Sequence, residues 1–296
     1  MSPVFVTLVI DTVAIVLPPG VKVPPLSGTR ETTDTETGAV EITGHYDNLF
    51  VKVNEDHSVF IQGSLPRFLT GSNLRMLRRQ GVREAVEKLS GAFSADPSLA
   101  KVVRLDVAAT VSLPRPVPCY YPVLGSASRF ERVPYRGGVL YRHRTRSLTV
   151  YDKGRRAGVA GHLLRFEASF KKRVNPQFGR VVMLSDLHEP GFYEVYVRRW
   201  LREYRRISKV RRHVLTPPSG VRDLTWQLAA VGLHAIGGEP VVSDMVDVWE
   251  MRRGRRYSMK RRLRELAAGG TSETDDALIA ELDGAIERAA RLALAS

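Results

Sequence analysis

The sequence predicts an α+β fold: a central, largely antiparallel sheet with flanking helices, followed by a small helical C-terminal part. Over roughly the first 170 residues, short runs rich in Val, Ile and Thr alternate with turn-forming residues, and helical patterns are rare. After Pro190 the apolar spacing becomes helical and stays so to the end of the chain. The short connections between the strand-like runs favour hairpins, and therefore antiparallel pairing.

The first run, residues 4–17, ends at Pro18-Pro19-Gly20, and residues 21–37 are expected to form a loop because Pro, Thr and acids dominate them. A helix is expected at 82–93, where Val82, Val86, Leu89 and Phe93 share one face. Further strands are expected at 39–43, 48–54, 58–65, 100–112, 138–141, 147–152 and 161–171.

The last third is expected to be helical in three places. The spacing of Trp200, Tyr204 and Ile207 predicts a helix through 198–213. A second helix is expected from about Ser258, after a loop around Gly254, and a terminal helix from Asp275. The Pro- and Gly-containing cluster at 216–220 is the candidate linker, which divides the chain into a domain over 1–215 and a basic helical region over 216–296.

Composition narrows the class of protein. With 43% apolar and 26% charged residues among 296, the chain resembles an ordinary globular protein. The single Cys119 excludes an intramolecular disulfide framework and is interpreted as a buried or incidental thiol. Residues 4–17 are interrupted by Asp11, are too short to span a bilayer and lack the marks of a signal peptide. A cytoplasmic protein without a membrane partner is expected.

The formal net charge of +14 is concentrated in two basic runs. Residues 198–213 contain eight Lys or Arg and one acid, and residues 251–264 contain eight and no acid. Because like charges repel unless an anion is present, both runs are predicted to contact nucleic-acid phosphates. The alternative is a pair of solvated helix faces. The predicted DNA-contacting residues of the runs are Arg198, Arg199, Arg202, Arg205, Arg206, Lys209, Arg211, Arg212, Arg252, Arg253, Arg255, Arg256, Lys260, Arg261 and Arg262.

Common catalytic motifs are missing from the sequence. No HExxH, no CxxC and no His-hydrophobe-His pair occurs, so a zinc site or a two-histidine metal site lacks its ligands. No GxxxxGK[ST] loop occurs, which argues against ATP-driven motor activity within the chain.

Three segments place an acid in a strand beside a basic residue: 104–106, 151–153 and 165–167. Carboxylates on neighbouring strands suit Mg²⁺ or Mn²⁺, so Asp106, Glu167 and Asp152 are the candidate metal ligands. Tyr151 beside such a metal is a candidate nucleophile on phosphorus, and Lys153, two residues on and expected on the same face, would stabilise the negative charge. The alternative is that each acid is only a salt-bridge partner and Tyr151 only a packing residue.

The order of these segments resembles a known family. VIDTV (9–13), GSLPRFLTGSN (63–73), RLDVA (104–108), SLTVYDKG (147–154), LRFEAS (164–169), SDM (243–245) through Trp249 and the basic YSMKRRLREL helix together resemble the gene II/X proteins. These are replication initiators of filamentous single-stranded DNA phages and related plasmids, and the resemblance covers about residues 9 to 267.

The resemblance implies rolling-circle replication initiation. The enzyme would act as an endonuclease that nicks one strand of phage or plasmid origin DNA, holds the 5′ end as a phosphotyrosine intermediate and later rejoins the strand. Tyr151 matches the nucleophile in the Tyr-x-Lys motif of similar Rep-trans plasmid initiators, and Asp106, Glu167 and Asp152 match metal-binding acids. Many relatives have an acid a few residues after that motif, whereas Gly154-Arg155-Arg156-Ala157 follows here. Duplex and single-stranded origin DNA and a host helicase are the implied partners.

Several alternatives stay open. Arg67, in the 63–73 segment, is expected either to contact a phosphate or to belong to a simple strand end and turn. Tyr193 and Tyr196 are competing nucleophiles, interpreted as packing or DNA-stacking residues. A non-enzymatic phage DNA-binding regulator or single-strand-binding protein would need the basic runs without the acids and Tyr151. A tyrosine recombinase ranks last, because such enzymes are mostly helical where this chain is rich in strands.

Overall fold

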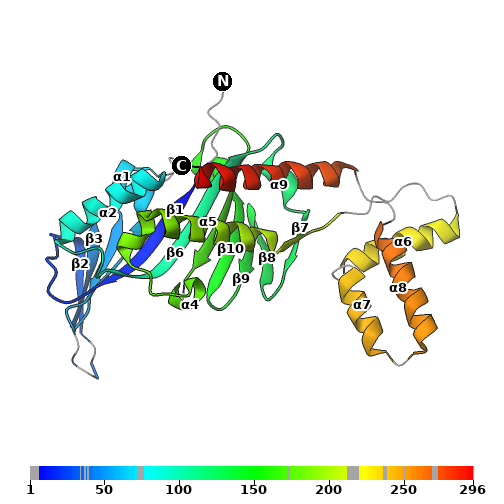
Figure 1. The fold of residues 1–296 in the computed structure, drawn as a ribbon, viewed down its shortest axis with the longest axis horizontal. Helices are drawn as coiled ribbons and strands as arrows, with labels where there is room; N and C mark the ends of the chain where they lie inside the picture. Colours follow the sequence, from blue (N-terminus) through cyan, green and yellow to red (C-terminus); the bar gives the residue numbers. More distant parts are fainter. Residues whose placement is uncertain are drawn as a thin grey trace.

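The computed structural model describes residues 7–33, 35–36, 38, 40–72, 77–171, 174–211, 220–235, 239–249, 251–268 and 273–295. Its centre is a ten-stranded sheet in which every neighbouring pair is antiparallel (Figure 1). The predicted α+β class with a large antiparallel sheet is therefore confirmed.

Across the sheet the strands run in the order β2-β3-β4-β5-β1-β6-β11-β10-β9-β8. Their bounds in that order are Ser27–Thr33, Val40–Tyr46, Leu49–Val53, Val59–Ser64, Thr7–Leu17, Lys101–Ser112, Leu163–Phe170, Arg146–Asp152, Gly138–Arg142 and Glu131–Tyr135. A second, two-stranded sheet pairs β12 (Ile207–Lys209) with β7 (Leu124–Ala127).

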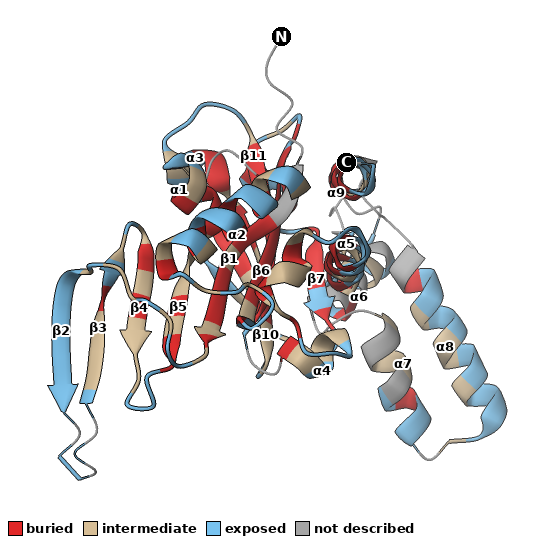
Figure 2. Ribbon diagram, turned by 60° about the vertical axis from the view of Figure 1, so that its left-hand side comes forward, coloured by how far each residue is buried: buried red, intermediate tan, exposed pale blue. Residues whose placement is uncertain are grey.

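Helices cover one face of the large sheet, which we call the core face (Figures 1 and 2). The Trp200 indole of α5 packs on Phe166 of β11, with ring centroids 5.2 Å apart, and Leu282 of α9 is fully buried in the same core. The helices of this layer are α1 (Leu65–Thr70), α2 (Arg79–Phe93), α4 (Val174–Phe178), α5 (Pro190–Arg205) and α9 (Glu273–Leu294), with 3₁₀ turns at Val117–Tyr120 and Leu184–His188.

Strand periodicity separates the two faces. In β5, Val59 and Ile61 are buried on the core face, whereas Phe60 and Gln62 are half-exposed on the other. Paired residues of neighbouring strands share a face, so Arg104, Asp106, Glu167 and Tyr151 lie on this second face as well. We call it the open face.

A separate cluster of three helices follows β12. Helices α6 (Val221–Ala235), α7 (Glu239–Val248) and α8 (Arg253–Ala268) pack around Leu233 and Leu266, with Trp226, Val242 and Leu263 against them. The chain then returns to the sheet with α9, so the last helix of the region 216–296 packs with the sheet body (Figure 1). Residues 216–219 of the expected linker lie outside the described residues.

Two sequence expectations about strands are wrong. Residues 21–37 were expected to be a loop, but they contain the edge strand β2, which is exposed along its whole length. An edge strand with both faces in water has no apolar alternation to predict it. The helix expected through residue 213 ends at Arg205, and Ile207 pairs with Ala127 in β12 instead, so tertiary strand pairing overrides the helical spacing.

Helix α8 begins at Arg253, five residues before the expected start near Ser258. Gly254 is therefore in the first turn of the helix and not in a preceding loop. No described helix is long and apolar enough to cross a membrane.

Candidate active site on the open face of the sheet

Three adjacent strands bring the predicted catalytic segments together. Tyr151 of β10 pairs directly with Arg165 of β11, and Ser169 of β11 pairs with Asp106 of β6. Since side chains two residues apart on a strand share a face, Arg165, Glu167 and Ser169 line up beside Tyr151 and Asp106. The strand register therefore places the acids of segments 104–106 and 165–167 on the face that carries the candidate nucleophile.

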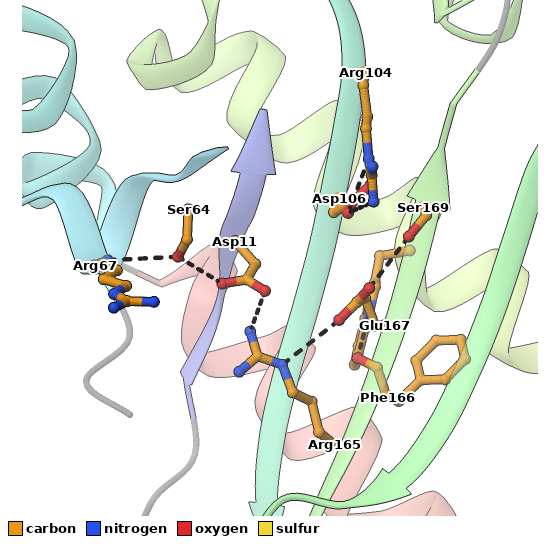
Figure 3. A network of polar contacts seen from close by, with 10 residues as sticks. Asp11, Ser64, Arg67, Arg104, Asp106, Arg165, Phe166, Glu167 and Ser169 are labelled. Atoms are coloured by element: carbon orange, nitrogen blue, oxygen red, sulfur yellow. Dashed lines mark hydrogen bonds and ion pairs between the residues drawn. The ribbon is translucent and has the colours of Figure 1, made fainter. Parts of the chain in front are cut away.

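Asp11 of β1 joins this group and was not singled out as a site residue from the sequence. The register of β1 against β6 shifts between Ile10 and Val13, which is the signature of a β-bulge, and Asp11 lies in that interval. Its Oδ2 lies 3.0 Å from Nη2 of Arg165, and its Oδ1 accepts a hydrogen bond of 3.2 Å from Ser64 Oγ (Figure 3). The feature of the sequence that could have identified Asp11 is that it is an acid within an otherwise apolar strand.

Arg165 is the most deeply buried charge of the group. Its side chain is 0% exposed, and besides Asp11 it lies 4.0 Å from Glu167 Oε2 through its Nε. A guanidinium removed from water in this way is tolerable only with carboxylates around it. Arg165 therefore supplies a fixed positive charge next to Tyr151.

Asp106 and Glu167 differ in how they are held. Arg104 donates two hydrogen bonds to Asp106 in a bidentate pair, from Nη2 to Oδ2 at 2.7 Å and from Nε to Oδ1 at 3.0 Å. Glu167 accepts a hydrogen bond of 3.2 Å from Ser169 Oγ. Burial raises the pKa of both carboxyls, and the neighbouring Asp106 charge raises the pKa of Glu167 further.

Tyr151 is 6% exposed, and burial raises the pKa of its phenol to about 12. The guanidinium of Arg156 lies 5.3 Å from the centroid of its ring. The charge on Arg165 acts in the opposite direction and lowers the Tyr151 pKa. The phenol is therefore protonated at neutral pH and next to two cations that favour its anion.

Lys153 does not share a strand face with Tyr151, contrary to the expectation from their two-residue spacing. Strand β10 ends at Asp152, and Lys153 is the first residue of the short helix α3 (Lys153–Ala157), so alternation does not set its direction. The Lys153 side chain is nevertheless buried, and the charges of Arg165, Asp11 and Glu167 all affect its pKa. Burial, followed by the Arg165 charge, lowers the pKa of Lys153 to about 8.

Asp152 has a structural task in this arrangement. It is the N-cap of α3, and its Oδ1 accepts a hydrogen bond of 2.8 Å from the backbone N–H of Arg155. The predicted ligand role for Asp152 therefore competes with a capping role.

The donor chemistry of the cluster suits a hard divalent cation, because the raised pKa values of Asp106 and Glu167 report buried carboxylates that a nearby positive charge would stabilise. Within the described part of the chain, no group of three or more His, Cys, Asp or Glu side chains has the arrangement of a metal site. A cation at Asp106 would also have to compete with Arg104.

Arg67 lies in α1, directly after β5. Ser64 caps this helix by accepting from the Arg67 N–H at 3.4 Å, and Gly71 closes it with a left-handed φ of 75°. The Arg67 side chain is exposed and lines a hollow of about 380 Å³ with Phe68 and Lys88. The segment 63–72 is thus a strand end and a short capped helix; Asn73 lies outside the described residues, and a phosphate contact for Arg67 stays a prediction.

The first basic run is largely paired inside the protein. Glu203, 0% exposed, lies 3.2 Å from Arg199, 3.3 Å from Arg206 and 3.7 Å from Arg146. Helix α9 supplies further acids, and the pairs are Arg205–Glu287 at 2.9 Å, Lys209–Asp283 at 3.4 Å and Arg211–Asp276 at 2.5 Å. Arg198 pairs with Glu194, Arg202 is exposed, and Arg212 lies outside the described residues. DNA contact by this run stays a prediction, and acids of the protein already neutralise most of its described cations.

The second basic run lies on α8 and just before it, and most of it is exposed. Lys260 pairs with Asp247 at 2.6 Å, and Arg261 and Arg262 share Glu265 at 3.5 and 3.6 Å. Within the described residues Arg252, Arg253 and Arg255 have no ion-pair partner, and Arg256 donates to the Trp249 carbonyl at 3.2 Å. Among the residues that the structure describes, this run keeps more unpaired positive charge than the first.

The two competing tyrosines are buried, whereas the single cysteine is not. Tyr193 and Tyr196 are 4% and 0% exposed, with ring centroids 4.9 Å apart, and belong to the hydrophobic core, which fits packing. Cys119, expected to be a buried or incidental thiol, is exposed.

No protein-family model matches this sequence, and no curated protein matches it. Among solved structures, the chain is similar to the rolling circle replication initiator protein from Geobacillus stearothermophilus, with a TM-score of 0.38 and 10% sequence identity over 90% of this chain and 99% of that chain.

Proposed function

We propose that this protein initiates rolling-circle replication by nicking and rejoining one DNA strand at an origin, with Tyr151 as the nucleophile. The observation that carries the proposal is the pairing of Tyr151 with the buried Arg165 on the open face, where Lys153 and three carboxylates complete the cluster. Nucleophile, cations and acids within one polar cluster are what phosphoryl transfer to a side chain requires.

The reaction proposed is a transesterification. The Tyr151 oxygen attacks phosphorus and the bond to the 3′ oxygen breaks, so the 5′ end stays on the tyrosine. The phenol gives up one proton and the departing 3′ oxygen gains one, so a phosphodiester is exchanged for another without ATP. Lys153, with a pKa of about 8, carries a positive charge at neutral pH, and with Arg165 it stabilises the phenolate and the charge on the attacked phosphate.

The proposed cofactor is Mg²⁺ or Mn²⁺, held by Asp106 and Glu167. When bound, such a cation polarises the phosphate and lowers the cost of forming the phenolate. Asp11 is a better third donor than Asp152, because Asp11 belongs to the carboxylate cluster whereas Asp152 caps α3.

The proposed partners are phage or plasmid origin DNA and a host helicase, in the bacterial cytoplasm. The resemblance of the ordered segments to the gene II/X family supports this assignment, as does the exposed positive charge of α8. Because the sequence has no nucleotide-binding loop, strand separation beyond the nick would fall to the helicase.

The test is cleavage of supercoiled origin DNA with Mg²⁺ or Mn²⁺, using the wild type beside Tyr151→Phe. The expected product is nicked or relaxed circles with protein attached to the 5′ end, and Tyr151→Phe is expected to give neither. Cleavage that survives in Tyr151→Phe refutes the assignment of the nucleophile.

One observation favours a second candidate, a non-enzymatic DNA-binding regulator or single-strand-binding protein. Asp106 is already satisfied by the two-point grip of Arg104, as a purely structural ion pair would be. This candidate predicts DNA binding with no cleavage of any origin under either metal.

A further inference from the structure

Two half-exposed aromatic rings lie on the open face, away from the hydrophobic core. Phe50 of β4 and Phe60 of β5 alternate with Val51 and Ile61, which are 0% and 1% exposed on the core face. The two rings lie 6.4 Å apart at 65°, and the exposed His45 ring lies 5.8 Å from Phe50. An aromatic cluster is therefore presented on a sheet face outside the core.

The strand register connects these rings to the Tyr151 cluster. His45 pairs with Phe50, Phe50 with Gln62, Gln62 with Ala14 and Ala14 with Arg104, which forms one row across five strands. With neighbouring strands about 4.8 Å apart, the row is roughly 19 Å long. It ends at the arginine that holds Asp106 and passes through the buried Ala14, so one row of the sheet joins the aromatic cluster to the candidate active site.

Cations flank the rings. Lys52 pairs with Phe60 across β4 and β5, and Lys101 pairs with Val16, the β1 neighbour of Phe60. Lys101 is exposed, whereas Lys52 lies 2.5 Å from Glu41. Arg104 closes the row with a side chain that is 27% exposed. Rings with cations beside them are complementary to a polymer of flat bases and phosphates.

We propose that Phe50, Phe60 and His45 form a binding track for single-stranded DNA, which leads the strand across the open face to Tyr151. Bases stack on the rings, and Lys101 and Arg104 contact phosphates. A sheet face that presents aromatic rings accepts unpaired bases, whereas the bases of a duplex are stacked on one another and unavailable. The track rests on the proposed function, since it supplies the strand that Tyr151 would cut.

The test measures how tightly the protein binds three labelled DNAs: an oligo(dT) of twelve nucleotides, an abasic strand of the same length and a duplex of twelve base pairs. The protein is the full chain carrying Tyr151→Phe, in EDTA at one fixed salt concentration, so cleavage cannot interfere. Phe50→Thr and Phe60→Thr remove a ring while keeping a residue that suits a strand. Phe60→Tyr keeps the stacking surface and is the matched control.

We expect each Thr variant to bind oligo(dT) about tenfold more weakly, because base stacking on one ring contributes roughly five- to hundredfold in affinity. Binding of the abasic strand is expected to fall less than twofold, and Phe60→Tyr is expected to bind like the parent. Wild-type-like oligo(dT) binding by folded Thr variants overturns the track, and so does an equal loss for the abasic strand.

A second variant covers the case in which a ring is needed for folding. Lys101→Glu is expected to weaken oligo(dT) and abasic strands alike by several-fold, with a shallower dependence on salt, whereas Lys22→Glu, at an exposed loop position, leaves both unchanged. No effect of Lys101→Glu overturns the phosphate contact and the path. Because binding is measured without cleavage, failure of the track and failure of Tyr151 as nucleophile give different results.

Discussion

Arg165 of β11 reaches across β6 to form an ion pair of 3.0 Å with Asp11 of β1. The guanidinium is fully buried, and the Asp11 side chain is 13% exposed. The pair ties the first strand of the chain to the strand that pairs with Tyr151, so it links the architecture of the sheet to the proposed chemistry.

Removing this partner is expected to destabilise the protein. Asp11→Asn removes the carboxylate 3.0 Å from the buried Arg165 guanidinium, and weakening the compensation of a buried charge in this way costs about 3 kcal/mol in the free energy of unfolding. Urea unfolding measures it, with Asp47→Asn as the control, since the Lys88–Asp47 pair is exposed and worth about 0.5 kcal/mol. Equal effects of the two substitutions would contradict the importance of the buried pair.

The nicking rate is expected to fall as Lys153 loses its proton. With a pKa of about 8, only about a tenth of the molecules keep a charged Lys153 at pH 9, so the rate at pH 9 is expected to be roughly tenfold below its plateau. Tyr151, with a pKa of about 12, stays protonated throughout and cannot cause this limb. Lys153→Arg is expected to move the falling limb to higher pH, and an unchanged profile would remove Lys153 from the mechanism.

Lys153 is expected to give the free energy of unfolding a pH dependence opposite to that of the nicking rate. The pKa of Lys153 is lowered from 10.5 to about 8 in the folded protein, so between these values the unfolded chain binds more protons. Stability relative to Lys153→Met is therefore expected to rise with pH across that window. Measuring both pH profiles therefore distinguishes the effect of the Lys153 charge on the nicking rate from its effect on the free energy of unfolding.

Metal binding is expected to stabilise the folded chain. A free concentration of Mn²⁺ one hundred times its dissociation constant adds about 2.7 kcal/mol, which EDTA removes and a melting curve records. Asp106→Asn and Glu167→Gln are expected to abolish this shift. Asp152→Asn is expected to keep it, because asparagine still caps α3. A shift that persists in both carboxylate variants would place the metal elsewhere.

Duplex binding is expected to depend on the second basic run. Replacing Arg252, Arg253, Arg255 and Arg261 by Gln should flatten the plot of log affinity against log salt by about 3 to 4 units if each contacts a phosphate. The matched set Arg198, Arg199, Arg205 and Arg211 is expected to change the slope less and to lower stability, because these residues hold Glu194, Glu203, Glu287 and Asp276. Equal slopes from both sets would contradict DNA contact by α8 and would favour the alternative that its basic residues form a solvated helix face.

Local patterns predicted much of this structure, and long-range pairing accounts for what they missed. Alternation in β4 and β5 and the two-residue spacing of Arg165 and Glu167 are properties of single strands, so they could be read from the sequence. The bulge that brings Asp11 to Arg165 depends on how β1 pairs with β6. Likewise, the counter-charges of the first basic run come from α9, which is distant in sequence.

Local capping explains the other differences at the site. Asp152 stays a predicted metal ligand, and in the turn from β10 into α3 its carboxylate also accepts a hydrogen bond from the Arg155 N–H. The same turn ends the strand before Lys153, so a period of two no longer applies there. A five-residue helix is too short to leave a periodic signal in the sequence.

The most direct test identifies the residue that becomes covalently attached to DNA. Wild-type protein is incubated with Mn²⁺ and a single-stranded origin oligonucleotide that is cut close to its 3′ end, and the adduct is digested and mapped by mass spectrometry. The account predicts the 5′ phosphate of the released fragment on Tyr151. An adduct on Tyr193 or Tyr196, or cleavage with no protein attached to the 5′ end, would contradict it.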